Sequence, residues 1–228
     1  MIFRQIPQSA TGCLAYIVAD EEAGELAVID PPADITLVQE EAKRVGLPIK
    51  VVFETHTHAD HVSGAHALGA KLGVAVHLPF LNRSRWPHES IGDGACLRVG
   101  DLCLRAIHSP GHTVCSMSLV MDDRVLVGDA LLVGTVGRSD FYDEGPEEMY
   151  HTIFDKILKL EDRLEVYPAH YGPKHGLPEK LMTTVGHERK TNEALTIKTK
   201  DEFIRYLTEG WPPKPHGWER IVETNLSG

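Results

Sequence analysis

The sequence predicts an α/β fold in which two sheets lie in layers and helices cover their outer faces. Strand-like runs alternate with helix-like runs in both halves of the chain, which is typical of layered α/β proteins. The 228 residues are enough to bury one sizeable core. No repeat of fixed period and no low-complexity tract interrupts this pattern, so a repeat array is disfavoured.

The first half of the chain begins with two β-rich runs separated by a short polar stretch that predicts a hairpin. The segment 33–47 then carries apolar residues at helical spacing and ends near Gly46, which suits a helix C-terminus. A third strand-like run leads directly into a group of histidines. The strands are predicted at 13–20, 25–31, 49–56 and 74–79, with a further helix at 62–73.

The second half predicts three consecutive strands, the last two joined at Asp122 and Asp123. A helix follows at 145–160, because Pro146 suits the first turn and the apolar residues recur with a period near 3.6. A short strand and two more helices complete the half. The strands are predicted at 100–110, 115–123, 124–131 and 164–170, and the later helices at 177–195 and 200–210.

We expect one catalytic domain over residues 1–210, followed by a proline-rich arm, residues 211–228, that packs on it as an irregular segment. The chain has 23 Lys and Arg against 33 Asp and Glu, a formal net charge of −10. No basic cluster interrupts this negative charge, so a phosphate backbone is an unfavourable partner. A nucleic-acid function is therefore disfavoured.

The four cysteines show neither CxxC spacing nor the density of a disulfide scaffold, which predicts buried thiols in a reducing compartment. The N-terminal stretch lacks the apolar core and cleavage site of a signal peptide, and no run approaches 18 apolar residues. We therefore expect a soluble, cytoplasmic protein with no membrane partner. The cysteines are Cys13, Cys96, Cys103 and Cys115.

The stretch FETHTHADH, residues 53–61, places several metal-ligand side chains at the end of the third predicted strand. In an extended backbone, side chains two residues apart project to the same side, so His56, His58 and Asp60 would lie together. A turn into the next helix would bring His61 within reach. Several such groups are costly to bury without a cation. The spacing therefore predicts a binding site for Zn, Fe or Mn in preference to a polar pocket without metal.

Three other candidate ligands also lie where predicted strands stop: His112, Asp129 and His170. Loops at strand ends are where a rigid scaffold displays reactive groups, so we expect these loops to meet the 56–61 stretch in one cleft. The other histidines lack such neighbours and are assigned to the surface or to packing, although His175 follows His170 closely. They are His66, His77, His88, His108, His151, His175, His187 and His216.

The motif THTHADH resembles the T-H-x-H-x-D-H signature of the metallo-β-lactamase fold. The stretches SPGHT, the GD at 128–129 and YPAH at 167–170 are similar to the later ligand motifs of that family, in the same order. The resemblance covers nearly the whole chain. It implies an αβ/βα four-layer sandwich with the metal at one edge, between the two sheets.

Three further stretches, VGDALLVGTVGRSDF, YPAHYGPKHG and TTVGHERKTNEAL, resemble the persulfide (sulfur) dioxygenases, which are related to the hydroxyacylglutathione hydrolases, or glyoxalase II. The tail PPKP resembles the end of the catalytic domain in rhodanese-fused dioxygenases, so we expect such a domain without the rhodanese. The resemblance implies oxidation of a small thiol persulfide by O₂ to sulfite and free thiol. The implied cofactor is one non-haem Fe(II) per chain.

The same resemblance assigns roles to individual residues. The iron ligands would be His56, His112 and Asp129. Four further residues hold a second metal in the hydrolases and are expected here as catalytic groups around the iron. They are His58, Asp60, His61 and His170.

Two residues are assigned to the substrate. Arg138 could pair with a substrate carboxylate through its planar fork, with a structural salt bridge to Asp140 as the alternative. Tyr171 directly follows His170, whereas glutathione-using relatives have a tyrosine two residues after the corresponding histidine. The loop before Arg138 reads GTVGR where those relatives show GCGR. These differences leave the identity of the thiol carrier open.

A dinuclear thioester hydrolase is the alternative enzyme, because all seven ligand positions of that class are present. Two Zn or Fe ions bridged by Asp129 would then activate a hydroxide. The C-terminal segment does not resemble the extra helical domain of those hydrolases, which favours the dioxygenase. A non-catalytic module is disfavoured because no ligand position is damaged. Expected partners are the persulfide and O₂, a possible separate rhodanese, and further copies in a homodimer or homotetramer.

Overall fold

The computed structural model describes residues 1–209, 211 and 213–228, and it contains two six-stranded sheets. In the first sheet the strands lie in chain order, with β3 parallel to β4 and β4 parallel to β5. Its strands are β1 (Ile2–Gln8), β2 (Cys13–Asp20), β3 (Glu25–Ile29), β4 (Ile49–Phe53), β5 (Ala75–Pro79) and β6 (Glu89–Ile91).

The second sheet has the order β14-β13-β10-β9-β8-β7, and only the β10–β13 pair is described as parallel. A two-stranded ribbon, β11 (Leu131–Leu132) with β12 (Thr135–Val136), follows β10. The strands of the second sheet are β7 (Cys96–Val99), β8 (Leu102–His108), β9 (Met117–Val120), β10 (Arg124–Gly128), β13 (Glu165–Pro168) and β14 (Thr183–Thr184).

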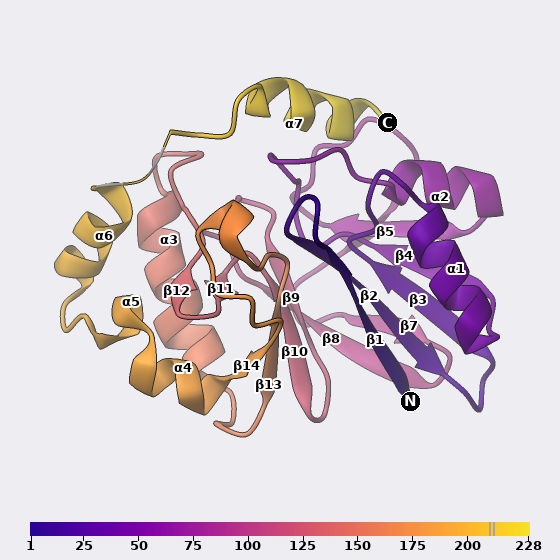
Figure 1. Cartoon of the computed structure of the whole chain (residues 1–228), viewed down its shortest axis with the longest axis horizontal. Helices are drawn as coiled ribbons and strands as arrows, with labels where there is room; N and C mark the ends of the chain where they lie inside the picture. The colour runs from indigo at the N-terminus through magenta and orange to yellow at the C-terminus, as the bar shows by residue number, and fades with distance from the viewer. Residues whose placement is uncertain (210, 212) are drawn as a thin grey trace.

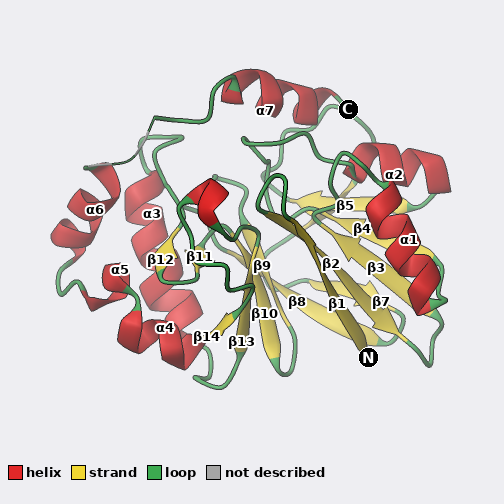
Figure 2. Ribbon diagram, in the orientation of Figure 1, coloured by secondary structure: helices red, strands yellow, loops and turns green. Residues whose placement is uncertain are grey.

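Helices cover the outer faces of both sheets, with α1 and α2 on one side and α3 to α6 on the other (Figure 2). Helix α3 continues into a π-helical turn at Thr152–Lys156 and a 3-10 turn at Ile157–Lys159, and another 3-10 turn spans Pro173–His175. The helices are α1 (Thr36–Val45), α2 (Ala65–Leu72), α3 (Gly145–His151), α4 (Val185–Thr191), α5 (Glu193–Thr196), α6 (Lys200–Thr208) and α7 (Trp218–Ser227).

Three separate apolar clusters hold the four layers together, one between the sheets and one beneath each group of helices. Strand β2 is buried along its whole length, because alternate side chains enter different clusters. Its residues in the cluster between the sheets are Leu14, Tyr16 and Val18. Its residues beneath α1 and α2 are Ala15, Ile17 and Ala19. The predicted four-layer sandwich is confirmed.

The helix predicted at 177–195 is wrong over its first part, because helical structure begins only at Val185. Leu181 and Met182 instead pack against the cluster between the sheets, and Gln5 Nε2 donates to Leu181 O at 2.7 Å. The side chain of Thr184 accepts a hydrogen bond from His187 N and so caps the start of α4.

The expectation of an irregular C-terminal arm is wrong for Trp218–Ser227, which forms helix α7. The domain boundary expected at residue 210 lies outside the described residues. In Figure 1, α7 (yellow) lies across the top of the molecule, with the C-terminus beside α2. Arg85 N donates to Leu226 O at 2.8 Å and Trp86 Nε1 donates to Asn225 O at 3.0 Å, so the helix is attached to the loop before β6.

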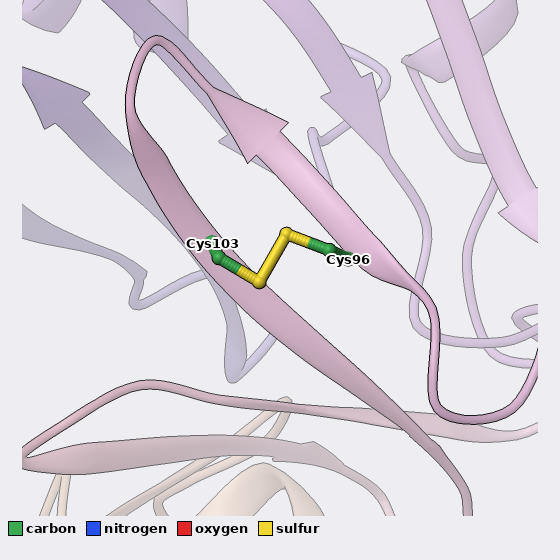
Figure 3. The surroundings of a disulfide bond; sticks show 2 residues. All are labelled: Cys96 and Cys103. Atoms are coloured by element: carbon green, nitrogen blue, oxygen red, sulfur yellow. A yellow bond between two sulfur atoms is a disulfide. The ribbon is translucent and has the colours of Figure 1, made fainter.

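Two of the four cysteines form a disulfide, so the expectation of four free thiols is wrong for this pair. Cys96 and Cys103 are bonded across the β7–β8 hairpin, with their Cα atoms 5.3 Å apart (Figure 3). Cys13 and Cys115 are free and buried. Disulfides are rare in reducing compartments, so this hairpin does not support the reducing compartment predicted from the cysteines. Over the part of the chain that the structure describes, no helix combines the length and apolar character needed to cross a membrane.

Candidate metal centre

Strand ends from both sheets meet at one edge of the sandwich and bring the predicted ligands together. His56 lies in the loop after β4, and Asp129 follows β10 directly. His170 follows β13, and His112 lies in the loop between β8 and β9. Met117 N donates to Thr55 O at 2.8 Å, which joins the loops of the two sheets beside these residues.

His56, His112 and Asp129 form a group in which one potential ligand atom from each lies within 4.8 Å of the others. It is named the iron triad after the cation that the sequence resemblance implies. Asp129 Oδ2 is 3.4 Å from His112 Nε2 and 3.9 Å from His56 Nε2. All three side chains are buried. His56 Nε2 has no hydrogen-bond partner among the described residues. A buried, unpaired nitrogen aimed at a carboxylate fits a bound cation, which would replace the missing hydrogen bond.

The outer ring nitrogens of both imidazoles are held by the protein, which fixes their orientation. His112 Nδ1 donates to Arg138 O at 2.8 Å. The Thr55 hydroxyl donates to Asp30 Oδ2 at 2.7 Å, so at 2.9 Å it can accept a hydrogen bond from His56 Nδ1. Each Nε2 atom is therefore left with its lone pair toward the triad. This is the usual support for metal-bound histidines.

The pKa values of the iron triad favour its metal-binding protonation state at neutral pH. Burial, together with neighbouring His58 and His112, holds the pKa of His56 well below its usual value. Burial also lowers the pKa of His112, and nearby Asp129 only partly opposes this. Burial alone would raise the pKa of Asp129, but His170 and His112 lower it overall. Neutral imidazoles and an ionised carboxylate are the forms that bind metals.

A second group, the Cys13 cluster, lies beside the iron triad and consists of Cys13, Asp60, His61 and His170, again with one ligand atom each within 4.8 Å of the others. His170 bridges the two groups, because its Nδ1 is 2.7 Å from Asp129 Oδ1 and its Nε2 is 3.0 Å from Asp60 Oδ2. Burial opposes a charge on His170, but Asp129 and Asp60 hold its pKa well above the usual value. In the metal-free protein, His170 therefore donates to both carboxylates.

Cys13 was not predicted from the sequence as a site residue. Burial opposes ionisation of its thiol, but hydrogen bonds with His170, His175 and His61 lower the pKa of Cys13 to about 4. Burial likewise opposes a charge on His61, yet Asp60 and Cys13 raise the pKa of His61 to about 10. His175, assigned from the sequence to the surface or to packing, has its ring centroid 4.2 Å from that of His170.

His58 lies beside the iron triad, with its ring centroid 4.2 Å from that of His56, but its Nε2 faces two other carboxylates. The distances are 3.5 Å to Asp30 Oδ1 and 3.6 Å to Glu54 Oε2. These three buried residues form a third group of possible ligands. Burial opposes protonation of His58, but Glu54 and Asp30 raise its pKa overall. The structure thus pairs His58 with buried acids behind the triad.

A cavity of about 540 Å³ is lined by His112 and Asp129 of the iron triad and by Asp60 and His170 of the Cys13 cluster. The assignment of Tyr171 to the substrate is not supported, because Tyr171 is not among the described residues that line this cavity. Its ring packs instead against the core between the sheets. The lining includes Asp60, His112, Asp129, Arg138, Phe141, His170, Lys174, His175, Leu177 and Trp211.

Arg138 lines the cavity, but its guanidinium is paired within the protein. Its Nε and Nη2 donate to the two carboxylate oxygens of Asp140 at 2.8 and 2.9 Å. Its Nη1 also donates to Pro213 O at 3.3 Å. This is the salt bridge that the sequence left open as the alternative role for Arg138. The pairing holds the loop whose carbonyl accepts from His112.

Helix α7 is tied to the metal-binding loop through the side chain of Asn225. Its Nδ2 donates to His58 O at 2.9 Å and to His61 O at 3.0 Å, and its Oδ1 accepts from Ser63 N at 2.9 Å. No sequence motif indicated this contact, because the two segments are more than 160 residues apart.

We expect Asn225→Ala to destabilise the protein by about 1–2 kcal/mol, because partly buried backbone groups lose their partners. Hydrogen exchange at the Ser63 amide should become faster. Thr224→Ala is the matched control, because the Thr224 hydroxyl, among the described residues, donates within α7 to Arg220 O. Equal exchange at Ser63 in the two variants would show that Asn225 does not hold the loop.

A buried set of imidazole and carboxylate ligands at the edge of an αβ/βα sandwich defines a metal-binding protein of the metallo-β-lactamase type. The model of the metallo-beta-lactamase superfamily matches residues 9–170, and the chain belongs to this superfamily. The chain is 31% identical to the mitochondrial persulfide dioxygenase ETHE1 of Mus musculus, over 99% of this chain and 88% of the relative.

Two other relatives bear on the choice between dioxygenase and hydrolase. The crystal structure of ETHE1 from Myxococcus xanthus matches with a TM-score of 0.93 and 30% identity, covering 100% of this chain and 99% of that one. A hydroxyacylglutathione hydrolase of Maricaulis maris is 32% identical over 75% of this chain and 66% of the relative. The resemblance to persulfide dioxygenases is therefore confirmed, and hydrolases are also among the relatives.

Proposed function

We propose that this protein is a persulfide dioxygenase that holds one Fe(II) at the iron triad and uses O₂ and water to convert a small thiol persulfide to sulfite, free thiol and protons. The observation that carries the proposal is that His56 Nε2 is buried, has no hydrogen-bond partner in the described part of the chain, and lies with His112 Nε2 near Asp129 Oδ2. Two imidazoles and one carboxylate are the ligand set of non-haem Fe(II) oxygenases. Similarity to persulfide dioxygenases over nearly the whole chain supports this choice of reaction.

The contacts around the triad suit a single cation that keeps coordination positions free for other ligands. Bound Fe(II) would supply coordination positions for O₂ and the persulfide sulfur. His170 donates to Asp129 Oδ1, which leaves Oδ2 toward the imidazoles. Thr55 and Arg138 O hold the outer nitrogens of His56 and His112. These contacts hold the three metal-ligand side chains in place and leave the side of the triad that faces the cavity open.

The cavity suits a small thiol compound with both apolar and anionic parts. Phe141, Leu177 and Trp211 supply apolar and aromatic surface, and Lys174 adds a positive charge at the exposed end. A persulfide carries negative charge on its terminal sulfur, which must enter toward the triad. Because Arg138 is paired with Asp140, Lys174 is the residue proposed to attract an anionic substrate.

We expect Lys174→Gln to raise KM for an anionic persulfide by about two- to fivefold and to leave kcat and iron content unchanged, because an exposed charge contributes at most about 1 kcal/mol. Lys180→Gln is the control, since Lys180 is exposed and not among the described lining residues. A fall in kcat at unchanged KM would contradict this role.

Metal analysis of anaerobically prepared protein, combined with O₂ uptake, tests the proposed function. We expect about one iron per chain, and O₂ consumption only when a persulfide is supplied. Sulfite should appear in proportion to the O₂ consumed. Stable occupancy by two zinc ions with no O₂ uptake would refute the proposal.

Thioester hydrolysis is the second candidate function, because Asp60, His61 and His170 place further ligand atoms beside Asp129. The hydrolase relative of Maricaulis maris also supports it. Two ions would then generate a hydroxide that attacks a thioester carbonyl. Loss of thioester absorbance at a rate exceeding persulfide-dependent O₂ uptake would favour this function over the dioxygenase.

The proposal also covers the sulfur donor, the cellular location and the oligomeric state. A separate rhodanese would supply the sulfane sulfur, and the chain would act in the cytoplasm as a homodimer or homotetramer. Light scattering of the purified protein tests the oligomeric state.

A further inference from the structure

The solvent-facing side of the β7–β8 hairpin carries the disulfide together with two arginines. Side chains alternate between the two faces of a strand, and Leu97 and Leu104 enter the cluster between the sheets. Cys103 and both arginines are exposed, and Cys96 is half-buried. The side chains on this outer face are Cys96, Arg98, Cys103 and Arg105. The disulfide bond crosses between the two strands on this face (Figure 3).

The register of the hairpin places each cysteine directly opposite an arginine. Cys103 pairs with Arg98 across the hairpin. Cys96 pairs with Arg105. Within the described part of the chain, neither arginine forms an ion pair, so both charges are available to a group at the disulfide. Charges separated by more than about 10 Å are largely screened at about 0.1 M salt, so these two arginines act locally although the chain carries a net charge of −10.

A second cavity, of about 440 Å³, lies beside the disulfide and is lined by residues of β6 and β7, the last strands of the two sheets. Cys96 and Arg98 both line it. Its lining also includes Glu89, whose Oε2 is 3.6 Å from Nδ1 of His77, another lining residue. None of the described lining residues belongs to the iron triad or to the Cys13 cluster. The cavity therefore has room for a small molecule beside a disulfide sulfur and a guanidinium.

We propose that the Cys96–Cys103 disulfide is redox-active and exchanges with small carboxylate-bearing thiols, which the two arginines attract to the hairpin. The incoming thiolate attacks Cys96 Sγ from the cavity, the S–S bond breaks, and Cys103 Sγ leaves as a thiolate. A mixed disulfide then joins the small thiol to Cys96. The leaving thiolate is stabilised by Arg98 across the hairpin and by Arg105 on the same face of its own strand.

A second thiolate completes the exchange by attacking the sulfur of the small thiol in the mixed disulfide. Cys96 leaves as a thiolate, and the two small thiols are released as one disulfide. The two electrons that they lose reduce the cysteine pair. Reduction removes the covalent link between β7 and β8, and the reverse reaction with a small disulfide restores it. These steps require neither iron nor O₂, so the site is separate from the proposed persulfide oxidation.

Rates of disulfide reduction by two thiols of opposite charge, mercaptopropionate and cysteamine, test the role of the arginines in anaerobic, full-length protein. Each rate is divided by the rate of the same thiol with a small uncharged disulfide, which removes differences in intrinsic reactivity. We expect mercaptopropionate to be favoured by about tenfold at low salt, because two unit charges act on the thiol at a distance of several ångströms. This preference should largely disappear at about 1 M salt.

The double variant Arg98→Gln with Arg105→Gln should lower the preference for mercaptopropionate to near one. The matched control is Arg44→Gln with Arg163→Gln, which removes the same charge from two exposed arginines in α1 and before β13. The control should keep the preference of the parent. An equal preference in the two double variants would overturn the proposal.

Peptide mass analysis of the parent after rapid alkylation gives a readout that needs no variant. We expect mercaptopropionate on Cys96 and the alkyl group on Cys103. Mercaptopropionate found instead on Cys103, or a disulfide that resists both thiols, would each overturn the proposal. Because persulfide and O₂ are absent from these experiments, the result does not depend on the proposed function.

Discussion

The Asp129→Ala protein is expected to be purified without iron and to show no persulfide-dependent O₂ uptake. Asp129 is the only anion of the iron triad, and its Oδ2 faces both imidazole Nε2 atoms. Loss of a residue that merely supports metal ligands costs about 10–100-fold in metal affinity. Removal of a ligand that also supplies the charge should therefore weaken iron binding by more than about 100-fold.

The same substitution should change the charge state of His170. In the parent, Asp129 and Asp60 together hold the pKa of His170 well above its usual value against the opposing effect of burial. Without Asp129, one of the two carboxylates that stabilise the imidazolium is lost. The apparent pKa of His170, followed by NMR in metal-free protein, should fall in Asp129→Ala.

Asp155→Ala is the matched control for this experiment, because Asp155 also accepts from a histidine but lies exposed on the surface. The His151 Nδ1 to Asp155 Oδ2 distance is 2.7 Å, the same as that between His170 Nδ1 and Asp129 Oδ1. Asp155→Ala should keep its iron and its activity. Equal iron contents in Asp129→Ala and the parent would remove Asp129 from the metal site.

The sequence predicted much of the sandwich because its strands are buried by simple patterns. Strand β2 carries no charged residue before Asp20 because both of its faces are covered. Strand β10 likewise places Val125 and Val127 in one cluster and Leu126 in another. The candidate ligands were found because each lies at or shortly after the end of a predicted strand, a feature visible in the chain itself. Helix α1 ends at Gly46, as predicted, with a left-handed φ of 82°.

The remaining features depend on contacts between distant parts of the chain, which local patterns do not encode. Cys13 enters the site only because β2 pairs with the segment after β13. Tyr171 was assigned to the substrate from its position beside His170, but neighbouring residues in an extended segment point to opposite sides. Its ring therefore packs between the sheets. The helix α7 contact with His58 and His61 likewise required the folded chain.

The Gly137→Ala protein is expected to lose iron although residue 137 has no side chain that could bind it. A Cβ at Gly137 would lie 1.8 Å from Asp129 O and 2.9 Å from Asp129 C, so the backbone of one of the two segments must move. Asp129 lies between β10 and β11, and Gly137 lies directly after β12, so the two residues flank the β11–β12 ribbon. Because metal ligands must be held within about 0.5 Å of their working positions, this movement should impair the triad.

Overpacking of this kind typically costs about 1–3 kcal/mol, so a lower free energy of unfolding should accompany the loss of iron. Gly92→Ala is the matched control, because Gly92 has ordinary φ and a Cβ there would meet nothing within 4 Å. It should keep the parent's iron content and stability. A Gly137→Ala protein that is destabilised yet binds iron as tightly as the parent would show that strain is absorbed in the β11–β12 ribbon. The position of Asp129 would then not depend on the contact between the two segments.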